Sequence, residues 1–146
     1  AAEILEEKYG VSTNVYSVTS FNELARDGQN ADRYNMLHPE SEQQVPYIAQ
    51  VMGSAPAIAA TDYMKSYADQ VRSFVPASSY RVLGTDGFGR SDSRENLRRH
   101  FEVNEAYIVV AALTELAKQG TVEKKVVAEA IAKFGIDADK MNPLYA

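Results

Sequence analysis

Residues 80–103 have the sequence YRVLGTDGFGRSDSRENLRRHFEV, which contains strand, turn and helix signals in succession. Residues 80–83 predict a short buried strand. The glycines that follow allow a loop with positive φ angles, whose backbone amides can approach another group closely: Gly84, Gly87 and Gly89. Asp92 and Glu95 have the spacing of a capping box, which predicts a helix that continues through Phe101. These elements together form half of a βαβ unit.

Two further runs predict strands. Residues 14–18 are rich in side chains with high β propensity, and residues 57–60 are small apolar residues that follow Pro56. The alanines of the second run predict that something bulky lies across that strand. Helical patterns separate the three predicted strands, which indicates an α/β domain with parallel pairing and right-handed crossovers.

Helices are predicted for most of the remaining chain. Ser20 and Glu23 form a second capping box, and Asn104 is the expected N-cap of the most apolar helix. In the amphipathic run 62–74, Met64 and Tyr67 fall on the packing face. The expected helices are residues 1–9, 21–28, 31–37, 46–52, 62–74, 105–118 and 122–134.

The first predicted helix begins at Ala1 with no capping residue ahead of it. In α/β domains such a helix is usually preceded by a strand, and three strands would make a thin sheet. We therefore expect residues 1–146 to be a single C-terminal domain of a longer chain, incomplete at its N-terminus. A bared sheet edge leaves backbone groups unpaired, so the chain on its own is expected to be dimeric or aggregation-prone.

Composition excludes several classes of protein. The chain has 146 residues, 45 % apolar and 24 % charged, which suits one ordinary globular core. Its net charge of −5 argues against a nucleic-acid binder, which needs a basic face. The absence of cysteine excludes disulfides and thiolate metal sites, and it fits a reducing cytoplasm. No apolar run reaches the roughly 18 residues of a membrane span, so we expect a cytoplasmic protein without a membrane partner.

Candidate site residues lie where the predicted strands end. Asp62 and Tyr63 follow residues 57–60, and α/β sheets bind ligands beside the carboxyl ends of their strands. The glycine-rich loop carries arginines that could hold an anion at a helix N-terminus, although its aspartates would repel phosphate. A purely structural turn explains the same loop, and Asp62 could simply start a helix. The candidates for an interface or anion contact are Asp62, Tyr63, Asp86, Gly87, Gly89, Arg90 and Ser91. No catalytic residue can be assigned.

Several segments, taken together, resemble one known family. They are VYSVTSFNELARDG (15–28), MLHP (36–39), VPY (45–47), AATDYMK (59–65) and LGTDGFGRSDSRENLR (83–98). The combination resembles the C-terminal region of the homodimeric decarboxylating component of bacterial pyruvate dehydrogenase complexes, and it covers essentially the whole chain. The resemblance implies the third domain of a transketolase-like subunit. That domain would be a three-layer α/β/α sandwich with a mainly parallel sheet, and its first strand or strands would precede Ala1.

The resemblance also implies the chemistry of the whole enzyme: pyruvate decarboxylation and reductive acetylation of lipoyl groups, with thiamine diphosphate and Mg²⁺. The implied partners are the rest of the subunit, the homodimer partner and the lipoyl acetyltransferase core. Such enzymes hold the metal with a GlyAspGly motif followed by AsnAsn, and here only TDG at 85–87 is similar. We therefore expect this segment to be structural, to bind no cofactor or metal and to be inactive alone. The alternative is a stand-alone α/β module for a small anion or a partner protein.

Overall fold

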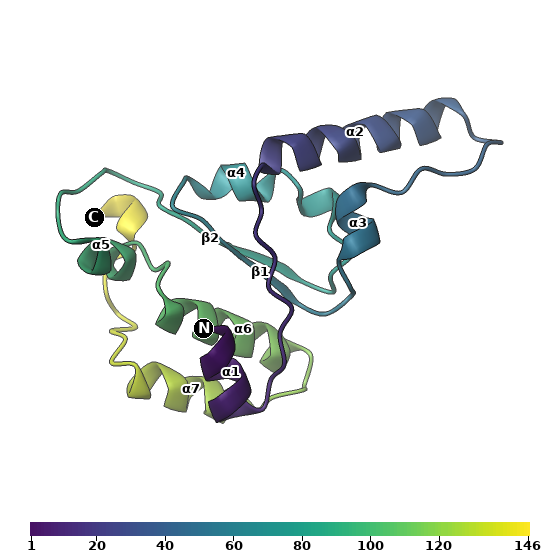
Figure 1. Ribbon diagram of the computed structural model, residues 1–146. Helices are drawn as coiled ribbons and strands as arrows, with labels where there is room; N and C mark the ends of the chain where they lie inside the picture. The colour runs from purple at the N-terminus through teal and green to yellow at the C-terminus, as the bar shows by residue number, and fades with distance from the viewer.

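A two-stranded parallel sheet lies at the centre of the computed structural model, which describes residues 1–146 (Figure 1). Its strands are β1 (Ala57–Ala60) and β2 (Tyr80–Leu83). Parallel strands need a crossover, and here it contains the helix α4 (Lys65–Asp69) and the 3₁₀ turn η1 (Arg72–Phe74). The two strands predicted in this part of the sequence, and their parallel pairing, are confirmed.

The third predicted strand does not form. Residues 14–18 are extended but pair with neither strand, and 78 % of the surface of Val15 remains exposed. The Tyr16 hydroxyl donates a hydrogen bond to the carbonyl oxygen of Val51, at 3.1 Å. A high β propensity creates a strand only where a neighbouring edge offers backbone partners. In this structure the segment serves as a connection between the two helical layers (Figure 1).

Helices cover both faces of the sheet (Figure 1). One layer consists of α1 (Ala2–Tyr9), α6 (Glu105–Lys118) and α7 (Lys124–Lys133). The other layer consists of α2 (Phe21–Leu37) and α3 (Tyr47–Val51) together with α4. Helix α6 packs on β1 and α4 packs on β2, so the expected α/β architecture with helices on both sides is confirmed.

Each layer has its own apolar core. The larger core joins α1, α6 and α7 through the buried residues Leu5, Val109, Leu113 and Ala130. The smaller core joins α2, α3 and the residue before η1 through Ala25, Ile48 and Val71. Tyr80 of β2 packs against the smaller core and α6 contacts β1, so the two-stranded sheet lies between the two helical layers.

Helix α2 is continuous, whereas the sequence predicted two helices separated near Gly28. Ser20 caps it as expected, since its hydroxyl accepts a hydrogen bond from the Glu23 amide. Gly28 is buried and helical, and a Cβ at that position would lie 2.3 Å from the ring of Phe74. The glycine is thus explained by close packing rather than by helix termination.

Other helix predictions were wrong at their starts, including 122–134, which begins at Lys124. The predicted helix 62–74 is reduced to α4 and η1, because Thr61 accepts a hydrogen bond from the Tyr63 amide and holds a turn there. The helix α5 (Arg94–His100) begins one residue later than predicted, with Ser93 as its N-cap. The chain ends in the 3₁₀ turn η2 (Pro143–Tyr145). No helix combines the length and the apolar character that a membrane crossing requires.

Candidate functional site

The loops after β1 and β2 meet at the carboxyl edge of the sheet. The Thr85 amide donates a hydrogen bond to the carbonyl of Tyr63 at 2.9 Å, and the Thr85 hydroxyl donates to the carbonyl of Asp62 at 2.7 Å. The Lys65 amide donates to Oδ1 of Asp86 at 3.0 Å. The structure therefore brings Asp62 and Tyr63 beside the glycine-rich loop, as parallel strands require.

Two glycines allow this close meeting of loops. A Cβ on Gly84 would lie 2.8 Å from the carbonyl oxygen of Tyr63. Gly87 has a φ of 98°, and a Cβ there would lie 2.4 Å from the carbonyl oxygen of Pro143. Gly89, by contrast, has open space around it. The glycine-rich loop is therefore packed against both the β1 loop and the C-terminal turn η2.

The charged candidates of this edge are mostly paired within the chain. Asp62 forms an ion pair with Arg98 at 3.2 Å, and Lys65 lies 3.9 Å from Oδ2 of Asp86. Arg90 and Ser91 are exposed and make no hydrogen bond or ion pair. Two of the predicted site residues are thus held by neighbours, and two remain available to a partner.

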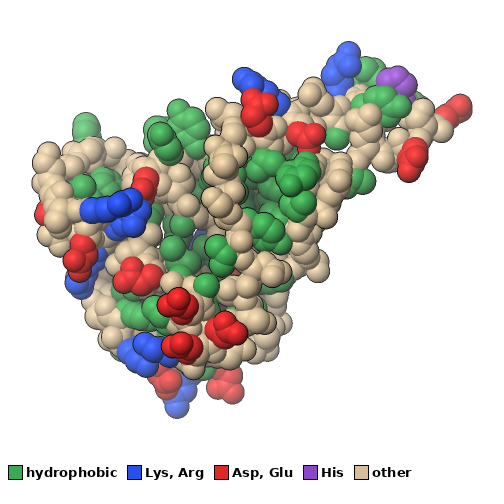
Figure 2. All heavy atoms as spheres, viewed as in Figure 1, with side chains coloured by type: hydrophobic (Ala, Val, Ile, Leu, Met, Phe, Trp, Pro, Cys, Tyr) green, Lys and Arg blue, Asp and Glu red, His purple; other side chains and the backbone are tan.

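The same edge carries exposed apolar side chains that no sequence pattern indicated. The rings of Tyr63 and Tyr67 lie 5.6 Å apart between centroids, and Phe88 is 82 % exposed. Figure 2 shows hydrophobic side chains exposed beside α4. We call this surface the sheet-edge platform, and its residues are Tyr63, Met64, Tyr67, Phe88, Leu144 and Tyr145. Helical periodicity had placed Met64 and Tyr67 in the interior, but α4 starts too late for that face to be buried.

The residues at this edge do not fit the metal-and-diphosphate site that the resemblance implies for the whole enzyme. Asp86 lies in the only similar motif, and the backbone and side chain of Lys65 already occupy its carboxylate. Nowhere in the structure do three or more His, Asp or Glu side chains converge in a way that could hold a metal ion. No chemical step is therefore assigned to a cofactor at this edge.

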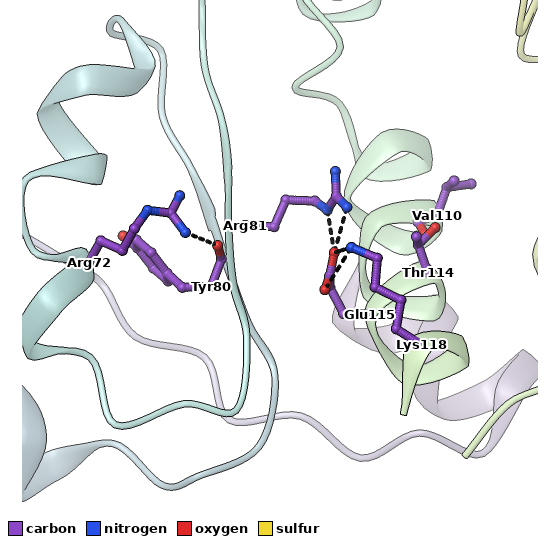
Figure 3. A network of polar contacts seen from close by, with 7 residues as sticks. All are labelled: Arg72, Tyr80, Arg81, Val110, Thr114, Glu115 and Lys118. Atoms are coloured by element: carbon purple, nitrogen blue, oxygen red, sulfur yellow. Dashed lines mark hydrogen bonds and ion pairs between the residues drawn. The ribbon is translucent and has the colours of Figure 1, made fainter. Parts of the chain in front are cut away.

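An ion-pair network around the buried Glu115 holds the sheet against α6 (Figure 3). Glu115 is only 4 % exposed, and its Oε1 lies 2.6 Å from both Nε and Nη2 of Arg81 on β2. Lys118 approaches the same oxygen at 3.1 Å. Burial acts to raise the pKa of Glu115, but the hydrogen bonds from Arg81 and Lys118 outweigh it and lower the pKa.

The other side of β2 is tied to the crossover (Figure 3). Arg72 donates a hydrogen bond to the carbonyl of Tyr80 at 2.7 Å, and its guanidinium lies 5.3 Å from the centre of the Tyr80 ring. The Tyr80 hydroxyl donates to the carbonyl of Ala68, and burial raises the pKa of Tyr80 to about 12. No sequence pattern predicted the contacts of Arg72 with Tyr80 or of Arg81 with Glu115. The one hint was that Glu115 is a charged residue within an otherwise apolar helix.

Comparison with known proteins identifies the family that this chain resembles. Residues 1–104 match the family described as the transketolase-like TK C-terminal domain. Over all 146 residues, the chain is 71 % identical to the pyruvate dehydrogenase E1 component of Escherichia coli K12 and 63 % identical to that of Haemophilus influenzae. Identity with the Pseudomonas aeruginosa protein is 54 % over 99 % of this chain. The chain spans only 16–17 % of the length of these relatives.

Proposed function

Since the chain belongs to the transketolase-like C-terminal domain family, we propose that it is the C-terminal domain of a pyruvate dehydrogenase E1 subunit. The observation that carries this proposal is the 71 % identity with the E. coli E1 component over the whole chain. The longer subunit would decarboxylate pyruvate and reductively acetylate lipoyl groups with thiamine diphosphate and Mg²⁺. It would act in the cytoplasm, with the acetyltransferase core as its partner in the complex.

Within that subunit the role of this domain is structural. The sheet-edge platform offers six large exposed apolar side chains on the loops and turns and on α4 at this edge, and exposed apolar surface of this kind can mark an interaction site. We assign the platform to contact with the rest of the same subunit. Arg90 and Ser91 lie on the loop that also carries Phe88, and they form the polar rim of this contact. The alternative of a stand-alone module that binds a small anion is disfavoured. The carboxylates of Asp62 and Asp86 lie at the same edge as the unpaired Arg90, and they would repel an anion there.

A chimera tests the proposed function. We expect that replacing the corresponding C-terminal region of the E. coli E1 component with this chain leaves pyruvate-dependent acetylation of lipoyl groups within about threefold of the parent, because the two sequences are 71 % identical over the exchanged region. The platform is tested by introducing Y63D and F88D into the chimera, which should abolish assembly of a soluble subunit. The matched control is G89A, a change in the same loop with no neighbour to disturb. A chimera that folds and assembles but is inactive would contradict the proposal.

We further predict that the chain alone does not bind thiamine diphosphate. The reason is that its only candidate motif has its carboxylate occupied by Lys65. Isothermal titration calorimetry of the chain with thiamine diphosphate and Mg²⁺ should give only the heat of dilution. The whole E. coli E1 component serves as the positive control and should show saturable binding. Saturable binding with a micromolar dissociation constant would show that the prediction is wrong.

A further inference from the structure

The end of the chain runs across the surface of the domain. Residues 135–146, which we call the strap, leave the end of α7, pass α5 and reach the carboxyl edge of the sheet, where they form η2 (Figure 1). Pro143 is the only buried residue of the strap. At its start, Arg99 of α5 donates a hydrogen bond to the carbonyl of Gly135 at 3.2 Å. A segment that buries so little surface depends on a few polar contacts for its position.

Lys140 makes the central contact between the strap and the rest of the domain. Its Nζ donates a hydrogen bond to the carbonyl of His100 at 2.7 Å. The same nitrogen lies 3.3 Å from Oε1 of Glu102, in the turn after α5, and 5.8 Å from the centre of the Tyr107 ring on α6. The Lys140 side chain is only 29 % exposed, so its ion pair is partly shielded from water. Lys140 therefore fastens the strap to α5 and α6.

The ring of His100, beside this fastening, contains a nitrogen without a partner. Nε2 of His100 is buried and makes no hydrogen bond. The ring packs edge-to-face on that of Phe101, with centroids 4.9 Å apart. A neutral imidazole can leave Nε2 unprotonated, whereas the protonated ring carries an N–H donor on both nitrogens. Protonation would therefore create a buried, positively charged donor without an acceptor, which is unfavourable.

The charges around His100 also oppose a positive ring. The groups that face it come from the glycine-rich loop, α5, the turn after α5, α6 and the strap, and they are Arg90, Arg99, Glu102, Tyr107, Asp137 and Lys140. Burial lowers the pKa of His100 below its ordinary value of 6.5. Arg90 and Lys140 lower this pKa further, whereas Glu102 acts in the opposite direction. The neutral ring thus stabilises the docked strap fully above pH 6.5, and this stabilisation is lost as the pH falls through the lower pKa of the folded chain.

We propose that protonation of His100 releases the strap from α5. The positive ring and the ammonium group of Lys140 line one depression, so the two cations repel each other. The strap is the element that moves, because few contacts hold it. Its release separates η2 from the glycine-rich loop and removes Leu144 and Tyr145 from the sheet-edge platform. This inference goes beyond the proposed function and does not depend on it, because it concerns contacts within this chain.

Two spin labels measure the docking of the strap. The natural chain has no cysteine, so G89C/Y145C carries one nitroxide on the glycine-rich loop and one on η2. Both positions tolerate a label, because Gly89 has no neighbour within 4 Å and Tyr145 is 77 % exposed. At pH 7.5 the docked strap should give dipolar broadening of the spectrum. Lowering the pH to 5 should remove about half of this broadening or more, while most carboxyl groups remain ionised.

The two histidines of the chain supply the variant and its matched control. In the labelled chain, H100F has a ring that cannot take up a proton, so it should keep its broadening at pH 5. H38Q removes the other histidine, which is exposed at the end of α2, and should lose the broadening as the natural sequence does. K140M removes the fastening and should lack the broadening at both pH values.

Circular dichroism establishes that each variant is folded, and H100Q serves in place of H100F if the latter does not fold. Broadening that persists at pH 5 in the natural sequence would overturn the proposal. So would its loss at pH 5 in a folded H100F or H100Q, or its persistence in H38Q at pH 5 or in K140M.

Discussion

Replacing Gly87 with alanine is expected to lower the free energy of unfolding by about 3 kcal/mol, since backbone strain and overpacking each cost about 1–3 kcal/mol. The φ of Gly87 is 98°, a conformation that side chains with a Cβ rarely adopt. The added methyl group would also lie 2.4 Å from the carbonyl oxygen of Pro143. Because that neighbour is backbone, it can move only if η2 leaves the glycine-rich loop.

Urea unfolding measures this effect, and Gly89 supplies the control. Alanine at Gly89 meets no atom within 4 Å, so G89A should change the free energy of unfolding by less than about 0.5 kcal/mol. Both glycines belong to the same short loop, so replacing either one with alanine should change the conformational entropy of the unfolded chain by a similar amount. Equal stability of G87A and G89A would mean that η2 does not pack on this loop.

The sequence predicted those parts of the fold that depend on local chemistry. Ser20 and Asn104 cap the helices they were expected to cap, because a capping side chain needs only the amides of the next turn. The strands β1 and β2 were found because a short apolar run lies between helical patterns in each case. By contrast, residues 14–18 have the composition of a strand but pair with neither β1 nor β2, because composition does not determine whether a run of residues reaches a free sheet edge.

The sequence predicted that the loops after β1 and β2 meet, but it did not predict the contacts that they make. Parallel strands place their carboxyl ends together, which is why Tyr63 and Asp86 meet through Thr85 and Lys65. What the sequence could not show is that Lys65 would occupy the carboxylate of Asp86. It also could not show that Leu144, some 60 residues further along the chain, would complete an apolar surface beside Gly87. Such contacts depend on the packing of segments that are far apart in the chain, and this packing leaves no periodic pattern in the sequence.

The buried network at Glu115 leads to the second large effect. We expect E115A to lower the free energy of unfolding by about 2 kcal/mol, less than the 3–5 kcal/mol of a fully buried pair. The reason for the smaller value is exposure: the side chains of Arg81 and Lys118 are 38 % and 60 % exposed, so water can solvate them when the carboxylate is lost. The control is E129A, which removes an exposed pair with Lys125 and should cost less than about 0.5 kcal/mol.

A change of both partners separates charge from packing. Replacing Glu115 by leucine and Arg81 by methionine together removes the ion pair and leaves apolar side chains of similar size. Buried pairs replaced in this way are often neutral or more stable, so we expect R81M/E115L to recover most of the loss seen in E115A. The double variant leaves neither charge without its partner. If it is nevertheless as unstable as E115A, the network stabilises the fold through the specific geometry of its contacts and not by neutralising charge.

The pH dependence of stability gives the network a signature that a packing defect would not have. Hydrogen bonds lower the pKa of Glu115 in the folded chain below its ordinary value of 4.5, so the folded state favours the carboxylate. Its contribution is therefore complete above pH 4.5 and is lost as the pH falls through the folded-state pKa. The stability difference between the natural chain and E115Q should be largest near pH 7 and should shrink below pH 4.5. Other carboxyl groups, such as Asp92, titrate in both proteins and cancel. A difference that stays constant from pH 7 to pH 3 would show that Glu115 acts by shape alone, and that the ion pair with Arg81 does not hold β2 to α6.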